Sequence, residues 1–130
     1  MKKCILFFSS ALFLAGCATA QNDDIIDQKL DSKQNKEIVL VKVINDSRCP
    51  QGVQCIWAGE ITFEVAAYEN RKLVEQTQLT LSPNKEKLVI DWFIKHLPES
   101  KTPLREINIG PYPKQDKLIT PADYFIKLIY

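Results

Sequence analysis

Cysteine and histidine are the residue types in this chain most able to do chemistry. The sequence holds four cysteines and a single histidine, His96. Cys49 and Cys55 have five residues between them, a wider gap than zinc knuckles use, and His96 adds only a third ligand. Thiol redox catalysis typically uses Cys-x-x-Cys at a helix N-terminus, which this spacing does not match. The cysteines therefore predict neither a metal centre nor a redox site.

Hydrolytic and phosphate chemistry find no better support in the sequence. Neither a Gly-x-Ser-x-Gly motif nor a phosphate-binding glycine loop occurs. His96 has serines such as Ser47 and Ser82 as conceivable partners, but no motif joins them, and Asp91 fits a surface position. We expect a non-catalytic protein without a cofactor, with a hydrolase or a metal-binding protein as less favoured alternatives.

The N-terminus carries a pattern typical of an export signal. Lys2 and Lys3 precede an apolar run, 5–14, which is shorter than the roughly 20 residues that a membrane-spanning helix needs. Small residues then lead to a cysteine in Leu14-Ala15-Gly16-Cys17. This segment resembles the lipobox of bacterial lipoproteins. The resemblance implies cleavage before Cys17, with diacylglycerol on its sulfur and an acyl chain on its new amine.

The residue after Cys17 indicates which membrane holds the protein. Ala18 stands where an aspartate would resemble an inner-membrane retention signal. We therefore expect a protein of the bacterial cell envelope, anchored in the membrane through the Cys17 lipid. In a source with two membranes, it would lie in the outer membrane and face the periplasm.

Export also determines the expected state of the remaining cysteines. Cys4 leaves with the signal and Cys17 carries lipid, so that Cys49 and Cys55 remain in an oxidising compartment. An even remainder of two, close in sequence, predicts one disulfide. Pro50 and Gly52 favour the sharp turn that brings the two cysteines together. Closing so small a loop stabilises the fold by about 2 kcal/mol on the chain-entropy model.

Length and charge predict one domain without affinity for nucleic acid. The 130 residues divide into a cleaved signal (1–16), a lipidated cysteine with a polar tether (17–36) and a single β domain (37–130). Loss of Lys2 and Lys3 leaves 15 basic and 16 acidic residues. A chain this close to neutral provides no electrostatic basis for nucleic-acid binding.

Short segments of β character follow one another through the domain. Val39, Val41 and Val43 belong to a β-branched run that ends at Asn45, and Ile61–Val65 alternates apolar and polar residues. Asn70-Arg71 suits a tight turn. Further strands are expected at 76–81, 104–109 and 124–130. The pattern predicts an all-β, mostly antiparallel fold, either a small β-sandwich or a partly open barrel.

The segment 85–97 fits two structures. Val89, Phe93 and Leu97 are spaced by four, which suits a short helix ended by Pro98. The apolar triplets 88–90 and 92–94 also suit strands on either side of Asp91. We favour the strands and keep the helix as the alternative.

A resemblance is carried by Asp46-Ser47-Arg48-Cys49-Pro50, then Cys55, then Trp57-Ala58-Gly59. This D-S-R-C-P-x4-C-x-W-A-G pattern resembles a family of small bacterial lipoproteins of unassigned function. A weaker similarity covers the C-terminal third, with the stop at 110–113 and an aromatic last strand near Tyr124. The resemblance implies an exported, lipid-anchored β domain and no reaction.

The segment around the two cysteines is the candidate binding loop. Its candidate residues are Arg48, Gln51, Val53, Gln54 and Trp57. The first four are expected at the surface, and Trp57 can pack over the sulfur pair or in the core. A rigid loop binds with a smaller ordering penalty, which favours non-catalytic binding or scaffolding with an envelope protein as partner. An inhibitor of an exported protease acting through the same loop is the alternative. The other possibility is that the disulfide only stabilises a small domain.

Overall fold

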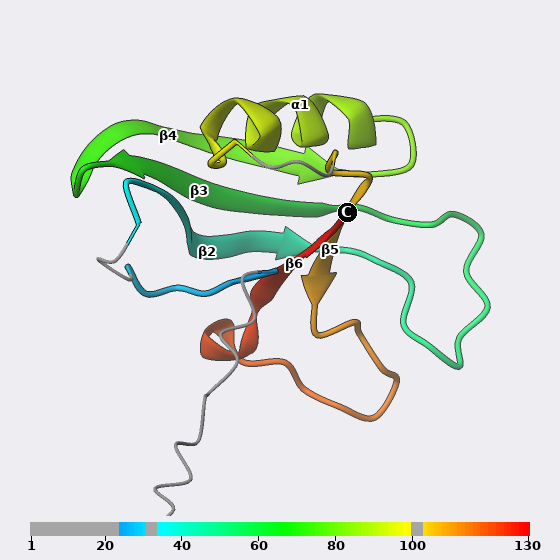
Figure 1. Ribbon diagram of the computed structural model, residues 1–130. Coiled ribbons are helices and arrows are strands. Elements are labelled where there is room, and N and C mark those ends of the chain that lie inside the picture. Colours follow the sequence, from blue (N-terminus) through cyan, green and yellow to red (C-terminus); the bar gives the residue numbers. More distant parts are fainter. Residues whose placement is uncertain (1–23, 31–33, 100–102) are drawn as a thin grey trace, which may run out of the picture.

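The computed structural model describes residues 24–30, 34–99 and 103–130, and the β-branched runs form the larger of its two sheets. Strands β2 (Lys36–Asp46), β3 (Ile61–Glu69) and β4 (Lys72–Leu81) pair as antiparallel neighbours in this order (Figure 1). All three strands were expected from the sequence.

The turn between β3 and β4 is as tight as the sequence predicts. Glu69 pairs with Lys72, so that only Asn70 and Arg71 form the connection. Both residues adopt positive φ, at 50° and 66°. This is the two-residue turn whose twist matches that of the strands, and asparagine tolerates it well.

A smaller sheet combines the two ends of the described chain. Strand β5 (Glu106–Gly110) pairs with β6 (Phe125–Ile129), and β6 pairs on its other side with β1 (Ile25–Ile26). A short 3-10 turn, η1 (Pro121–Asp123), precedes β6 and was not expected from the sequence.

Strand β1 corrects the expectation that residues 17–36 are only a tether. Ile26 is 8% exposed and belongs to the core, and the carbonyl of Asp24 accepts a hydrogen bond from the Leu128 N–H at 2.8 Å. The carbonyl of Asp27 accepts one from the Leu40 N–H at 3.1 Å. An isoleucine in a polar stretch, such as Ile26, has more to gain from burial than from solvation. Residues 1–23, with Cys17 and the expected signal, lie outside the described residues.

The segment that follows β4 is a helix, so the favoured strand interpretation of 85–97 is wrong. Helix α1 (Glu86–His96) buries Val89 and Phe93, which are 2% and 0% exposed. The spacing of four places these two side chains on one face, which the strand interpretation ignored. The helix ends before Leu97 and Pro98, as its alternative interpretation predicted.

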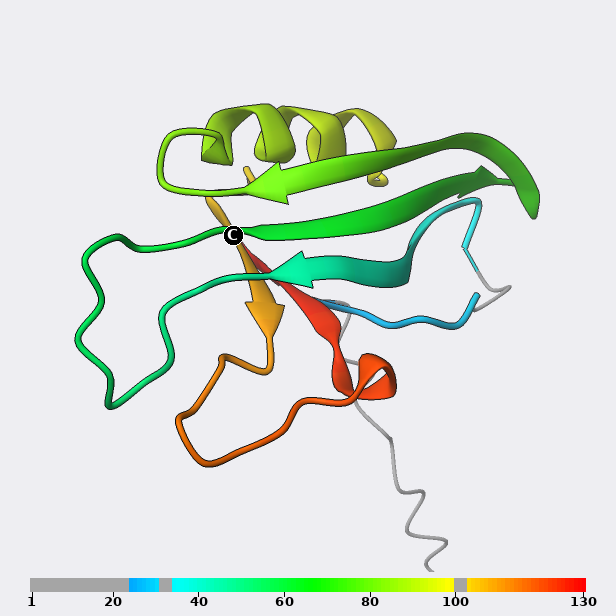
Figure 2. The ribbon, with the colours of Figure 1, turned by 180° about the vertical axis from the view of Figure 1, so that it is seen from behind.

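The core lies between the large sheet on one side and helix α1 with the small sheet on the other (Figures 1 and 2). The mostly antiparallel β fold is confirmed, and within the described residues the two sheets do not close into a barrel. The buried cluster consists of Ile26, Ile38, Leu40, Ile61, Phe63, Val65, Val89, Phe93, Leu104, Ile107, Ile109, Ile126 and Leu128.

Replacing Phe93 by alanine tests the helix packing. Phe93→Ala leaves a cavity between α1 and the sheets, and we expect it to lower the free energy of unfolding by about 3–5 kcal/mol. Leu88→Ala is the matched control on the same helix, because Leu88 is 71% exposed. Urea denaturation followed by circular dichroism measures both. A loss of similar size in the two variants would contradict the packing.

Candidate functional site

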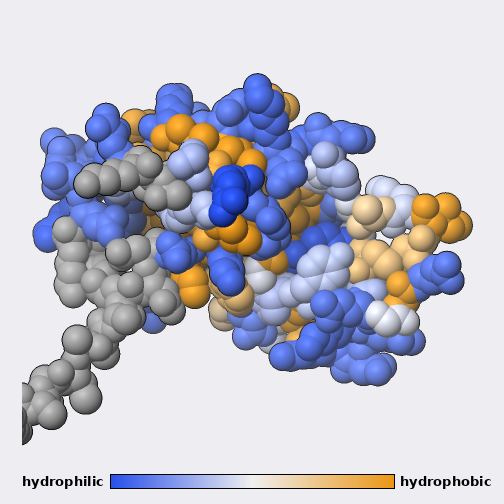
Figure 3. Space-filling view, turned by 45° about the vertical axis from the view of Figure 1, so that its right-hand side comes forward, coloured by the Kyte–Doolittle hydropathy of each residue, from blue (hydrophilic) through white to orange (hydrophobic). Residues whose placement is uncertain are grey.

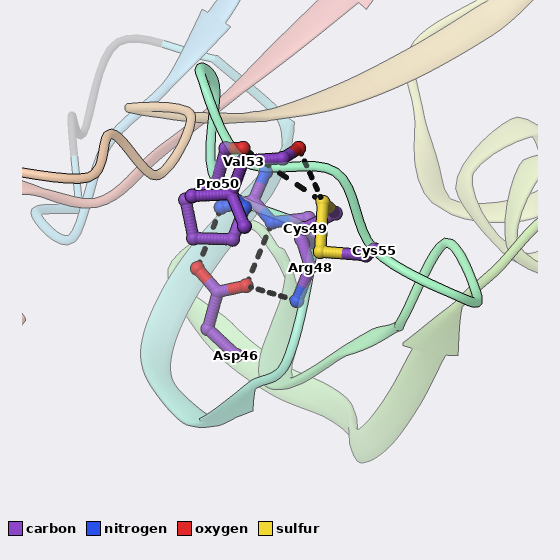
Figure 4. Close-up of a disulfide and its surroundings, with 6 residues drawn as sticks. All are labelled: Asp46, Arg48, Cys49, Pro50, Val53 and Cys55. Atoms are coloured by element: carbon purple, nitrogen blue, oxygen red, sulfur yellow. Dashed lines mark hydrogen bonds and ion pairs between the residues drawn. A yellow bond between two sulfur atoms is a disulfide. The ribbon is translucent and has the colours of Figure 1, made fainter.

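The connection between β2 and β3 is a long loop closed by a disulfide. Cys49 and Cys55 are bonded, with their Cα atoms 5.9 Å apart (Figure 4). Between them, the Val53 N–H donates to the Pro50 carbonyl at 3.2 Å, and Gly52 adopts a φ of 87°. The predicted disulfide and the predicted turn at Pro50 and Gly52 are therefore confirmed. We name residues 47–60 the binding loop.

The stem of the binding loop extends the antiparallel pairing of β2 and β3. The Ser47 N–H donates to the Glu60 carbonyl at 2.9 Å, and the Cys49 N–H donates to the Ala58 carbonyl at 3.2 Å. Gly59 has a φ of 72°, and a Cβ atom there would lie 1.9 Å from the Ser47 carbonyl oxygen. The backbones of the two stem segments approach so closely here that only glycine fits this position.

Arg48 holds the base of the loop against the small sheet, and the expectation that it is a surface contact is wrong. Its side chain is 11% exposed. Nε and Nη2 donate to the two oxygens of Asp46 at 2.8 and 2.7 Å, and Nη1 donates to the Ile109 carbonyl at 2.6 Å. Nη2 also reaches the Pro111 carbonyl at 3.1 Å, and the guanidinium lies 5.0 Å from the centre of the Tyr112 ring. The planar guanidinium suits these fixed acceptor positions, and its donors are therefore used within the protein.

Asp46 supplies the charge that Arg48 requires. Its side chain is 9% exposed, and its Oδ2 also accepts a hydrogen bond from the Tyr124 hydroxyl at 3.1 Å. Burial raises the pKa of Asp46, but the hydrogen bonds and the charge of Arg48 outweigh burial and leave this pKa below its ordinary value. The pKa of Tyr124 is raised, first by burial and then by the Asp46 charge. Asp46 therefore ties Arg48 to Tyr124, the residue just before β6.

We call residues 50–57 the tip of the binding loop. The tip presents apolar side chains to solvent (Figure 3). Val53, Ile56 and Trp57 are 40%, 104% and 70% exposed. Trp57 therefore does not lie in the core, which was one of the two positions expected for it. Ile56 is the most exposed of the three although it was not among the expected residues, and its position between Cys55 and Trp57 could have singled it out. Gln51 and Gln54 are exposed, as expected.

His96 lies in a separate cluster between α1 and β4. Its side chain is 5% exposed. Nε2 lies 2.6 Å from Glu75 Oε2, and the ring lies 4.5 Å from that of Trp92. The pKa of Glu75 is lowered, first by the hydrogen bond from Lys95 and then by those from Trp92 and His96.

The structure does not join His96 to the serines considered as partners. The Ser47 hydroxyl donates to the Glu60 carbonyl at 3.0 Å and accepts from the Glu60 N–H at 3.1 Å, within the loop stem. Asp91 pairs instead with Lys87 along the exposed face of α1, at 3.9 Å. Ser47 and Asp91 thus make local interactions, within the loop stem and along α1.

No family model, curated protein or solved structure matches this chain. The resemblance to small lipoproteins therefore stays a prediction that depends on residues 46–59. Among the residues that the structure describes, no helix is both long and apolar enough to cross a membrane.

Replacing Asp46 by asparagine tests the ion pair at the loop base. At pH 7 we expect Asp46→Asn to lower the free energy of unfolding by about 3 kcal/mol, because it leaves the buried Arg48 charge without a partner. Tyr124→Phe is the control, since it removes one hydrogen bond and is expected to lower the free energy of unfolding by about 1 kcal/mol. Urea denaturation at pH 7 measures both variants.

The same pair predicts a direction of pH dependence. The pKa of Asp46 in the folded protein is below its ordinary value of 3.8. The contribution of the ionised carboxylate to the free energy of unfolding is therefore complete at pH values above this ordinary value. The contribution is lost as the pH falls through the lowered pKa. The difference between wild type and Asp46→Asn should therefore shrink below pH 3.8. A difference that is absent at pH 7, or that grows in acid, would contradict the assignment.

Proposed function

We propose that this protein is a lipid-anchored component of the bacterial cell envelope that makes a non-catalytic contact through the binding loop. The observation that carries the proposal is the contrast within this loop. Its base is fastened by a disulfide and a buried ion pair, while its tip presents Ile56 and Trp57 to solvent. In a stable monomer nothing is gained by holding a large apolar side chain in water, so we infer that a partner covers the tip.

Rigidity supports a binding role for the loop. The Cys49–Cys55 bond, the Arg48 hydrogen bonds and the Ser47–Glu60 stem restrict the loop before any contact forms. Association then loses less conformational freedom than it would with a mobile loop. Tryptophan is also among the residue types that contribute most to binding where they become desolvated.

The polar groups at the loop base support a non-catalytic role. The Arg48 guanidinium binds Asp46 and two backbone carbonyls, and the Ser47 hydroxyl binds the backbone of Glu60. Each of these groups is engaged in holding the loop in shape. The binding loop therefore combines a structural base with an apolar contact surface.

Anchoring is the first testable part of the proposal. The segment Leu14-Ala15-Gly16-Cys17 supports a lipid on Cys17, and Ala18 supports the outer membrane in a source with two membranes. Mass spectrometry of protein purified from its native host should find Cys17 as the first residue, with diacylglycerol and an acyl chain added. Cys17→Ser should remain unprocessed and should lack the acyl mass. A wild-type protein that keeps Met1 and carries no lipid would overturn the anchor.

Contact through the tip is the second testable part. We expect a photoreactive benzoylphenylalanine at position 56 to form adducts in the native envelope, because Ile56 is fully exposed at the tip. The same residue at position 88 is the matched control, since Leu88 is 71% exposed on helix α1. Gel analysis and mass spectrometry identify the adducts, whether lipid or protein. Equal labelling at the two positions would refute contact through the loop.

A further inference from the structure

A second loop lies beside the binding loop and extends its surface. The connection 111–120 between β5 and the η1 turn projects from the same end of the molecule as the binding loop (Figures 1 and 2). The Gln51 N–H donates to the Pro113 carbonyl at 2.9 Å, and Gln51 and Lys114 form an isolated β-bridge. We name residues 50–57 and 112–118 together the two-loop end.

The two-loop end concentrates exposed apolar and aromatic side chains. Ile56 and Leu118, at 104% and 87%, are the most exposed of the large apolar residues that the structure describes. Trp57 and Tyr112, at 70% and 45%, add two aromatic rings with polar atoms. These four residues belong to two loops that meet through the Gln51–Pro113 hydrogen bond and the Gln51–Lys114 bridge.

The charges of the two-loop end have a positive balance. Lys114 and Lys117 are exposed, with Asp116 between them. Arg48, at the base of the end, already has its charge matched by Asp46. The end therefore presents apolar and aromatic side chains bordered by lysines, which is the chemistry of segments that lie in the headgroup region of a bilayer. Anionic headgroups would attract the lysines.

A lipid on Cys17, as in the proposed function on which this step depends, would keep the domain within reach of the membrane. Because β1 begins at Ile25, only seven residues separate it from Cys17. Eight peptide steps span at most roughly 28 Å. A domain of this size has a radius of gyration of about 13 Å, so that its diameter exceeds the span of that connection. An anchored domain can therefore move no farther from the membrane surface than that span allows.

We propose that the contact made by the binding loop is with lipid. The two-loop end inserts Ile56, Trp57 and Leu118 into the interface of the membrane that carries the anchor, and Lys114 and Lys117 meet the headgroups. The lipid on Cys17 and the two-loop end then hold the domain at two points, which sets its orientation on the membrane.

Tryptophan fluorescence tests the insertion, because the chain has two tryptophans in different surroundings. Lipidated protein is reconstituted into phosphatidylethanolamine–phosphatidylglycerol vesicles with brominated acyl chains. In the Trp92→Phe variant, we expect bromine to reduce the emission of Trp57 by about half, since interfacial side chains reach about 5–10 Å into the bilayer. In the matched Trp57→Phe variant, the emission of Trp92, which donates a hydrogen bond to Glu75, should not change.

A second pair of variants keeps both tryptophans and protects the test against loss of folding. Ile56→Asp should abolish the bromine quenching, and Leu88→Asp, on helix α1, should leave it unchanged. Circular dichroism verifies the fold of each variant.

The outcomes separate this proposal from the proposed function. Anchored protein whose Trp57 is quenched by aqueous acrylamide but not by brominated lipid would overturn lipid insertion. If position 56 then forms an adduct with a protein, contact through the loop stands and its partner is a protein. Protein without acyl mass on Cys17 would overturn both the anchor and the two-point attachment.

Discussion

The pair of Asp46 and Arg48 is the interaction on which the arrangement of the molecule depends. Asp46 is the last residue of β2 in the large sheet, and Arg48 donates to the Ile109 carbonyl in β5 of the small sheet and to the Pro111 carbonyl just after this strand. Tyr124, just before β6, adds its hydroxyl to Asp46. One partly desolvated ion pair thus links both sheets and the base of the binding loop. Because both partners are almost buried, neither tolerates the loss of the other.

The disulfide and the ion pair act at different levels of the same loop. The Cys49–Cys55 bond closes a small ring and restricts the chain even when the protein is unfolded. The Arg48 hydrogen bonds exist only in the folded state, and they determine where that ring points. The first makes the loop compact, and the second fixes its direction relative to the sheets.

Much of the fold could be predicted because its signals are local. The β-branched run of β2, the alternation of β3 and the Asn70-Arg71 turn each depend on neighbouring residues. Helix α1 was misjudged because its short apolar triplets suit either structure, and only packing against the sheets decides between them. Strand β1 was missed because two isoleucines form a strand only when β6, about a hundred residues later, pairs with them.

The difference between local and long-range signals also explains which parts of the candidate site could be predicted. The Cys49–Cys55 pairing and the need for glycine at position 59 could be predicted, since both follow from spacing and backbone freedom. The role of Arg48 could not, because its acceptors at Ile109 and Pro111 lie more than sixty residues away in sequence. A position in the core was considered for Trp57 because tryptophan is usually well covered, yet Trp57 is 70% exposed.

The pairing of β1 with β6 has a consequence for the order in which the domain matures. Ile25 lies opposite Lys127, so the small sheet joins an early part of the chain to a late one. The hairpin of β3 and β4 needs only a two-residue turn and can form while the chain is still emerging. The small sheet has to wait until the last strand, β6, has been synthesised. Its closure then fixes Ile25 and Ile26 against the body of the protein, so that β1 takes its place only at that final step.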